Sequence, residues 1–178
     1  VQKDMVSRLT MLGMPNVRFE ISIDHTEMSI AGIDKVAFLF SANKSMPLQP
    51  ISQVASGGEI ARVMLSLKAM ISGAVKLPTI VFDEIDTGVS GKMAECMALT
   101  MKEMGDSNRQ VISITHLPQI AAMGSHHYKV TKTDNSDTTT TSMTELDEGQ
   151  RVREIAQMLS GSDITEAAMC NARELLNK

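Results

Sequence analysis

The sequence predicts an α/β fold in which a mostly parallel sheet is flanked by helices and accompanied by a β-hairpin. Two short, largely apolar segments, 79–82 and 111–115, have the composition of buried parallel strands. Amphipathic helical patterns at 59–72 and 93–104 precede them, and this order favours parallel pairing through right-handed crossovers. An alternating pattern on both sides of a polar turn, within 127–146, predicts the hairpin.

The N-terminal part of the chain is expected to hold one helix, two strands and a loop. Apolar residues at helical spacing predict a short helix over 1–12. Residues 17–23 alternate in the manner of a half-buried strand, and 36–40 form a second apolar strand. Two prolines within 42–54 indicate a loop.

The C-terminal part is expected to hold the hairpin and two helices. The hairpin strands cover 127–133 and 138–146, and the threonines of the second favour a solvated strand. Apolar residues within 152–159 recur at helical spacing and predict a closing helix. Asp163, followed three residues later by Glu166, has the pattern of a capping box for another helix. Because no internal repeat or second boundary is visible, residues 1–178 are expected to form a single domain.

Composition and charge exclude some classes of protein. The net charge is −4, whereas a domain that binds nucleic acid by itself is more often basic. No apolar run reaches the ~18 residues of a transmembrane helix, so no membrane partner is expected. Cys96 and Cys170 lack metal-type spacing, and no export signal is visible, so a reducing cytoplasm is expected.

The start of the helix at 59–72 has the features of an anion site. The sequence there is Ala-Ser-Gly-Gly-Glu, in which Ser56 can cap the helix and Gly57 and Gly58 allow close approach of a ligand. Unpaired N–H groups and the positive end of the helix dipole favour a phosphate beside Ser56 to Glu59. The alternative is an ordinary helix start with a flexible turn.

Two adjacent carboxylates, Asp83 and Glu84, end the apolar strand at 79–82. Ligands of α/β proteins bind at the carboxyl edge of parallel strands. Since side chains alternate along a strand, the two carboxylates would project differently and serve different roles. We predict that Asp83 holds Mg²⁺ and that Glu84 accepts a proton from, or orients, an attacking water. The alternative is a solvated acidic turn.

The loop that follows, Asp-Thr-Gly-Val-Ser-Gly over 86–91, is not a phosphate-binding P-loop. The pattern G-x-x-x-x-G-K-[ST] would require glycine where Asp86 stands and serine or threonine where Met93 stands. No other stretch of the chain fits this pattern. We therefore expect that the chain cannot hold the β- and γ-phosphates of a nucleotide by itself.

A histidine, His116, ends the second parallel strand at 111–115. It is expected beside Asp83 and Glu84, because parallel strands end at one edge of the sheet, where polar groups of a site converge. We predict a catalytic role for His116. The alternative is a structural histidine.

In their order, these four motifs resemble the signature motif, Walker B motif, D-loop and switch histidine of ATP-binding-cassette ATPases. Glu59 stands where transporter cassettes usually have Gln, and Ile85 where they usually have Pro, as in SMC-type heads. Three longer stretches are similar to the RecN family of DNA-repair ATPases: 38–43, 54–68 and 115–121.

The resemblance implies that the chain is the C-terminal lobe of a P-loop ATPase head, with 1–12 as the end of a returning coiled-coil helix. The Walker A half would be absent from this chain. Two heads would sandwich two ATP molecules with Mg²⁺. Each group of residues would then have its own place: Ser56, Gly57, Gly58 and Glu59 on the ATP of the other head; Asp83, Glu84 and His116 on that of their own; and the D-loop residues Asp86, Gly88 and Ser90 at the dimer interface.

By this resemblance the whole protein would hydrolyse ATP as a head-to-head homodimer and support DNA double-strand-break repair and recombination. It would contact DNA through the full-length protein, at the nucleoid in the cytoplasm, and the isolated fragment would be inactive. Three alternatives stay open: an SMC-like chromosome-organising head, a transporter nucleotide-binding subunit, and an inert nucleotide-binding module.

Overall fold

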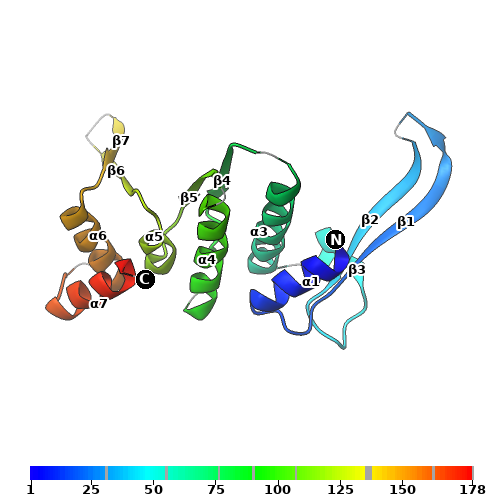
Figure 1. The fold of residues 1–178 in the computed structure, drawn as a ribbon, viewed down its shortest axis with the longest axis horizontal. Helices are drawn as coiled ribbons and strands as arrows, with labels where there is room; N and C mark the ends of the chain where they lie inside the picture. The colour runs from blue at the N-terminus through cyan, green and yellow to red at the C-terminus, as the bar shows by residue number, and fades with distance from the viewer. Residues whose placement is uncertain are drawn as a thin grey trace.

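Packed groups of elements lie side by side along the longest axis of the molecule (Figure 1). The structure is a computed structural model. It describes the following residues: 1–30, 32–54, 56–75, 77–89, 91–106, 108–134, 138–161 and 163–177.

The N-terminal group is a helix packed on an antiparallel sheet. Helix α1 (Gln2–Met11) precedes strands β1 (Arg18–Ser29), β2 (Gly32–Ser41) and β3 (Gln49–Pro50), which pair in that order, and helix α2 (Ile51–Val54) follows. The predicted loop at 42–54 therefore contains a short strand and a short helix. Buried apolar residues of this group pack together, and Val63 of the helix that follows joins their core: Met5, Leu9, Met14, Val17, Phe19 and Phe40.

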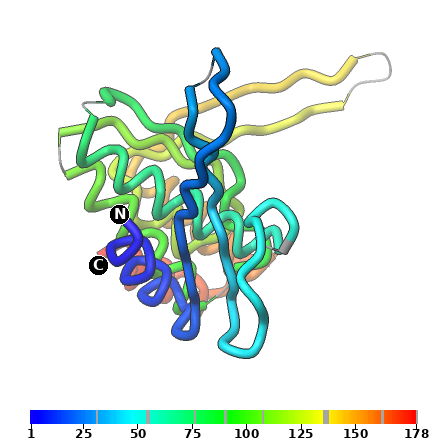
Figure 2. Tube along the Cα trace, turned by 90° about the vertical axis from the view of Figure 1, so that its right-hand side faces the viewer, coloured from blue at the N-terminus to red at the C-terminus, as the bar shows by residue number. Residues whose placement is uncertain are grey.

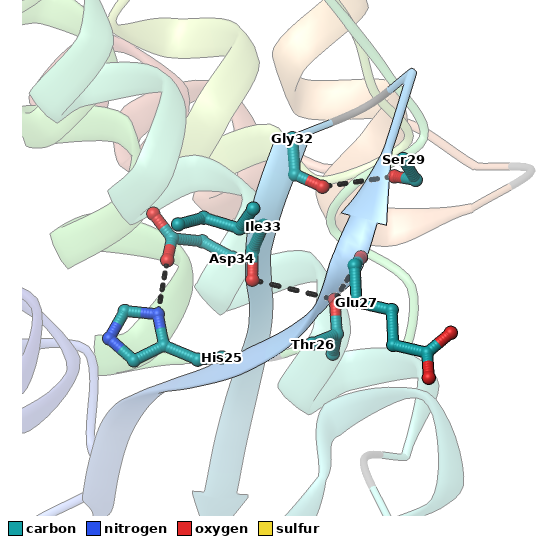
Figure 3. Close-up of polar contacts among 7 residues, drawn as sticks. All are labelled: His25, Thr26, Glu27, Ser29, Gly32, Ile33 and Asp34. Atoms are coloured by element: carbon teal, nitrogen blue, oxygen red, sulfur yellow. Dashed lines mark hydrogen bonds and ion pairs between the residues drawn. The ribbon is translucent and has the colours of Figure 1, made fainter.

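Strands β1 and β2 continue beyond this core as a long ribbon (Figures 1 and 2). Polar contacts hold its tip: His25 Nδ1 lies 2.9 Å from Asp34 Oδ1, and Ser29 Oγ donates to the Gly32 carbonyl at 3.0 Å (Figure 3). The strands predicted at 17–23 and 36–40 exist but were predicted too short. The outer part of the ribbon is exposed on both faces, so its sequence does not alternate.

The central group contains the predicted helix–strand–helix–strand unit. Helix α3 (Gly57–Ala74) leads to β4 (Thr79–Asp83), and helix α4 (Lys92–Asp106) leads to β5 (Gln110–Ile114). The two strands are parallel, with Thr79 opposite Gln110. They form the one parallel pair among the described residues, where the other paired strands are antiparallel. The prediction of a mostly parallel sheet was therefore wrong for the part of the chain that is described.

The described residues cover one face of the β4–β5 pair. Ile80 and Phe82 point into an aliphatic and methionine-rich core between α3 and α4. On the opposite face, Val81, Ile112 and Ile114 are 47%, 42% and 51% exposed. An apolar face is thus left bare on the strands that lead to the predicted site.

The C-terminal group consists of α5 (Pro118–Ala122), the hairpin β6 (Tyr128–Asp134) and β7 (Thr139–Glu145), and the helices α6 (Glu148–Ser160) and α7 (Glu166–Leu176). The hairpin and the closing helix were both predicted correctly. The capping box predicted at Asp163 was wrong. The Oγ1 of Thr165, not Asp163, caps α7 by accepting the Ala168 N–H at 3.1 Å. Within the described part of the chain, no helix is long and apolar enough to cross a membrane.

Candidate functional site

The carboxyl ends of β4 and β5 meet at one edge and carry the predicted polar residues. Asp83 pairs with Ile114 in the parallel register, and the Glu84 N–H donates to the Ile114 carbonyl at 3.1 Å. His116 follows two residues after Ile114. The structure therefore brings Asp83, Glu84 and His116 to the same edge, as the strand pattern predicted.

The backbone turns sharply at Glu84, immediately after β4. Glu84 has a φ of 45°, in the left-handed region that side chains other than glycine rarely adopt. Thr87 Oγ1 donates to the Glu84 carbonyl at 3.0 Å and supports the turn. Such strained positions persist where the surrounding structure imposes them, often at functional sites.

Asp83 and Glu84 are both exposed. Mg²⁺ commonly takes one or two carboxylates and completes its shell with water and phosphate oxygens, so this pair fits it. Among the described residues, no group of three or more His, Cys, Asp or Glu side chains is arranged to hold a metal ion. Any further ligands would therefore come from outside this set.

Asp86 lies inside the protein, unlike the two carboxylates before it. Its side chain is 1% exposed, and its Oδ2 accepts a hydrogen bond from Thr115 Oγ1. The same oxygen lies 3.6 Å from His116 Nδ1. His116 itself has a side chain that is 65% exposed. Asp86, the first residue of the segment that resembles a D-loop, therefore faces His116 of its own chain.

The start of α3 presents an open, capped helix N-terminus. The Ser56 N–H donates to Glu59 Oε2 at 2.7 Å, which is one half of a capping box. A Cβ added to Gly57 would meet no atom within 4 Å, whereas one added to Gly58 would lie 3.5 Å from the Thr87 carbonyl oxygen. The glycine turn therefore packs against the loop that follows Glu84, and Gly57 faces open space.

Two other loop residues were predicted to belong to the site. Gly88 is exposed and has a φ of 73°, a conformation for which glycine is the natural residue. Ser90 lies outside the described residues.

Sequence reasoning missed Thr115 and Arg62. Arg62 Nε donates to the Gly58 carbonyl at 3.0 Å, and its Nη1 donates to the Leu12 carbonyl at 3.3 Å. Arg62 therefore joins the glycine turn to the end of α1. The contact with Gly58 could have been predicted, because Arg62 lies one helical turn after it. The contact with Leu12 could not, because the two residues are 50 positions apart in the chain.

One concave feature lies elsewhere among the described residues. It is an open cleft between α1 and β1, lined by residues that include Gln2, Val6, Phe19 and Ile21. None of the candidate site residues lines it, and its position away from the β4–β5 edge gives it no part in the site.

Curated proteins similar to this chain are DNA repair proteins. The DNA repair protein RecN of Vibrio cholerae is 42% identical over 167 residues, which cover 93% of this chain and 30% of that protein. RecN of Haemophilus influenzae is 36% identical over 177 residues, covering 98% of this chain and 32% of that protein. The chain is homologous to the RecN DNA repair proteins. It spans about a third of the length of these RecN relatives, and no protein-family model matches it.

Solved structures that align with this RecN homologue identify its fold. An Smc head domain with coiled coil and joint from Pyrococcus yayanosii aligns with a TM-score of 0.69 at 19% identity, covering 89% of this chain and 29% of that one. A chain from work on ATP-driven dimerization and DNA-stimulated activation of SMC ATPases aligns with a TM-score of 0.59 at 16% identity, covering 91% and 92%. The fold is that of a fragment of an SMC-type head.

Proposed function

We propose that this chain is the C-terminal lobe of a RecN-type ATPase head and that it contributes to ATP hydrolysis in a head-to-head dimer. The observation that carries the proposal is the edge where Asp83, Glu84 and His116 come together at the ends of parallel strands. No Walker A pattern occurs in the sequence. The Walker A half of the same protein would therefore complete the site.

The uncovered apolar face of β4 and β5 supports the proposal that a second half of the head packs on this chain. Parallel strands are normally covered on both faces, yet Val81, Ile112 and Ile114 are about half exposed here. The N-terminal half of the head would cover this face and place its phosphate-binding loop near Asp83 and Glu84. Residues 1–12 would then be the end of the returning coiled-coil helix.

Within a complete head, each residue would have its own task. Asp83 would hold Mg²⁺, which when bound offsets negative charge on the phosphates. Glu84 would accept a proton from the attacking water, and its exposed carboxylate is free to approach one. His116 would turn its ring toward the γ-phosphate. Hydrolysis needs these groups in place together, because phosphoryl transfer depends on positioning and charge.

The second head would supply the other side of the nucleotide. Ser56, Gly57, Gly58 and Glu59 would present the α3 N-terminus to the ATP of the opposite head. The open space around Gly57 leaves room for a phosphate. Gly58 packs on Thr87, so the signature turn and the D-loop, including Gly88 and Ser90, would meet the partner as one surface. ATP would thereby clamp two heads together.

We place this clamp in DNA double-strand-break repair and recombination, at the nucleoid in the cytoplasm. The relatives are named as DNA repair proteins, which favours this role over a chromosome-organising head or a transporter subunit. The net charge of −4 makes this lobe a poor DNA-binding surface. DNA contact would therefore come through the rest of the full-length protein.

ATP hydrolysis by the separated halves tests the proposal. The chain alone and the N-terminal half alone should each be inactive, and their mixture should hydrolyse ATP. The rate should rise more steeply than linearly with head concentration, because two heads form each site. Strong hydrolysis by the chain alone would reveal a phosphate site of its own and would overturn the split-head account.

A further inference from the structure

We infer that Asp86 is a positioning residue for His116, held in place by Thr115. The D-loop resemblance places Asp86 at the interface between heads, but its side chain points into its own chain. The inference rests on the proposed function, since it concerns how His116 is presented to the nucleotide.

Three groups form a connected series at the end of β5. The Leu117 N–H donates to Thr115 Oγ1 at 3.0 Å, and Thr115 Oγ1 donates to Asp86 Oδ2. The Thr115 hydroxyl thus has its acceptor and its donor roles both filled, which fixes its orientation. A fixed hydroxyl holds one carboxylate oxygen of Asp86 beside the ring of His116.

Asp86 contacts the ring of His116 from one side. Its Nδ1 lies 3.6 Å from Asp86 Oδ2, while most of its side chain is exposed. The distance exceeds that of a formed hydrogen bond. Contacts of this kind are often long in the ligand-free state and shorten when substrate is bound. A small rotation of the ring would let Nδ1–H donate to Asp86 and would direct Nε2 outward, toward the nucleotide.

Because Asp86 is buried, a carboxylate with a purely structural role would destabilise the fold at this position. At 1% exposure, Asp86 Oδ1 has no hydrogen-bond partner among the described residues. A buried carboxylate oxygen without a donor destabilises the fold, and a well-packed apolar side chain of similar volume would avoid this. The nearby imidazole faces the other oxygen, Oδ2, and its Nδ1–H can give this carboxylate a further hydrogen bond, in the same way that outer-shell carboxylates orient histidine ligands.

A double-mutant cycle in the reconstituted head tests the coupling. Asp86→Asn should lower the kcat of ATP hydrolysis about tenfold or more, with the KM for ATP nearly unchanged, because ring placement acts on turnover. His116→Ala should lower kcat at least as much. If Asp86 acts through His116, adding Asp86→Asn to His116→Ala should cause no further loss. Losses that multiply would overturn the inference.

Variants of Thr115 separate positioning from folding. Thr115→Val removes the hydroxyl but keeps the branched shape, and Thr115→Ser keeps the hydroxyl. Thr115→Val should lower kcat, and Thr115→Ser should restore most of it. Equal rates for the two variants would contradict the inference. Glu84→Gln serves as the reference for the proposed function. If Glu84→Gln leaves the kcat of ATP hydrolysis intact, the proposed function fails. If Glu84→Gln lowers kcat while the losses from Asp86→Asn and His116→Ala multiply, only this inference fails.

Discussion

The Glu84 N–H donates to the carbonyl of Ile114 across 3.1 Å, even though Glu84 has left strand geometry with a φ of 45°. The bond adds one more link to the β4–β5 pairing at the point where the chain turns. It thereby fixes the backbone of Glu84 while its carboxylate is exposed. Pairing to the neighbouring strand offsets part of the strain of the left-handed conformation.

Glu84→Gly should therefore stabilise the chain while removing the carboxylate. Relief of a left-handed conformation contributes about 1 kcal/mol to the free energy of unfolding, part of which is lost to the greater freedom of glycine in the unfolded chain. Glu84→Val should destabilise the chain by a similar amount, since a branched side chain is least tolerated there. Urea unfolding of both variants measures the difference, and equal stabilities would argue against a strained turn.

Gly57→Ala should weaken pairing of the heads without weakening the fold of the chain. Because nothing lies within 4 Å of the added methyl, the free energy of unfolding should not fall. The methyl group would instead occupy the space proposed for the partner's nucleotide, and ATP-driven dimerisation should be strongly weakened. Sedimentation of the full-length protein with ATP measures the dimer.

Gly73→Ala is the matched control for Gly57→Ala. Gly73 belongs to the same helix, near its other end, and also has no atom within 4 Å of an added Cβ. It should leave ATP-driven dimerisation unchanged. Equal effects of the two alanines on dimerisation would show that the signature turn has no special role.

His127 should make the chain less stable in acid. Its burial, and next the positive charge of Arg151, lower the pKa of the imidazole below its ordinary value of 6.5. As the pH falls through 6.5, the unfolded chain takes up a proton that the folded chain does not, so the free energy of unfolding decreases. The stabilisation is complete at higher pH, where both states are neutral.

Thermal unfolding between about pH 8 and about pH 5 measures this linkage. His127→Gln cannot titrate and should lose less stability than the wild type over this range. An identical pH dependence in His127→Gln and in the wild type would contradict the assignment to His127.

Elements that pack against the central core were predictable from the sequence. Helices α3 and α4 appear within two residues of the predicted bounds because their apolar residues recur at helical spacing, and strands β4 and β5 do so because they are short apolar runs. The outer ribbon of β1 and β2 has no core to face, so its strands carry no such repeat. The start of α7 was misplaced because Thr165 and Asp163 are both good caps, and only the contact with Ala168 distinguishes them.

The placement of the candidate site residues was predictable where it depends on strand ends. Asp83, Glu84 and His116 follow apolar strands, and parallel pairing brings such ends together. The pairing of Asp86 with Thr115 was not predictable, since it joins residues 29 positions apart through side chains alone. The exposure of Val81 was also not predictable, because parallel strands normally have two covered faces.

Glu84→Gln tests the central claim most directly. It removes the proposed base and keeps the shape of the side chain, and Glu174→Gln, at an exposed position on α7, is the matched control. We expect steady-state ATP hydrolysis by the full-length protein to fall about a hundredfold or more in Glu84→Gln, with ATP-driven dimerisation intact, and to be unchanged in Glu174→Gln. Unchanged hydrolysis in Glu84→Gln would contradict the account.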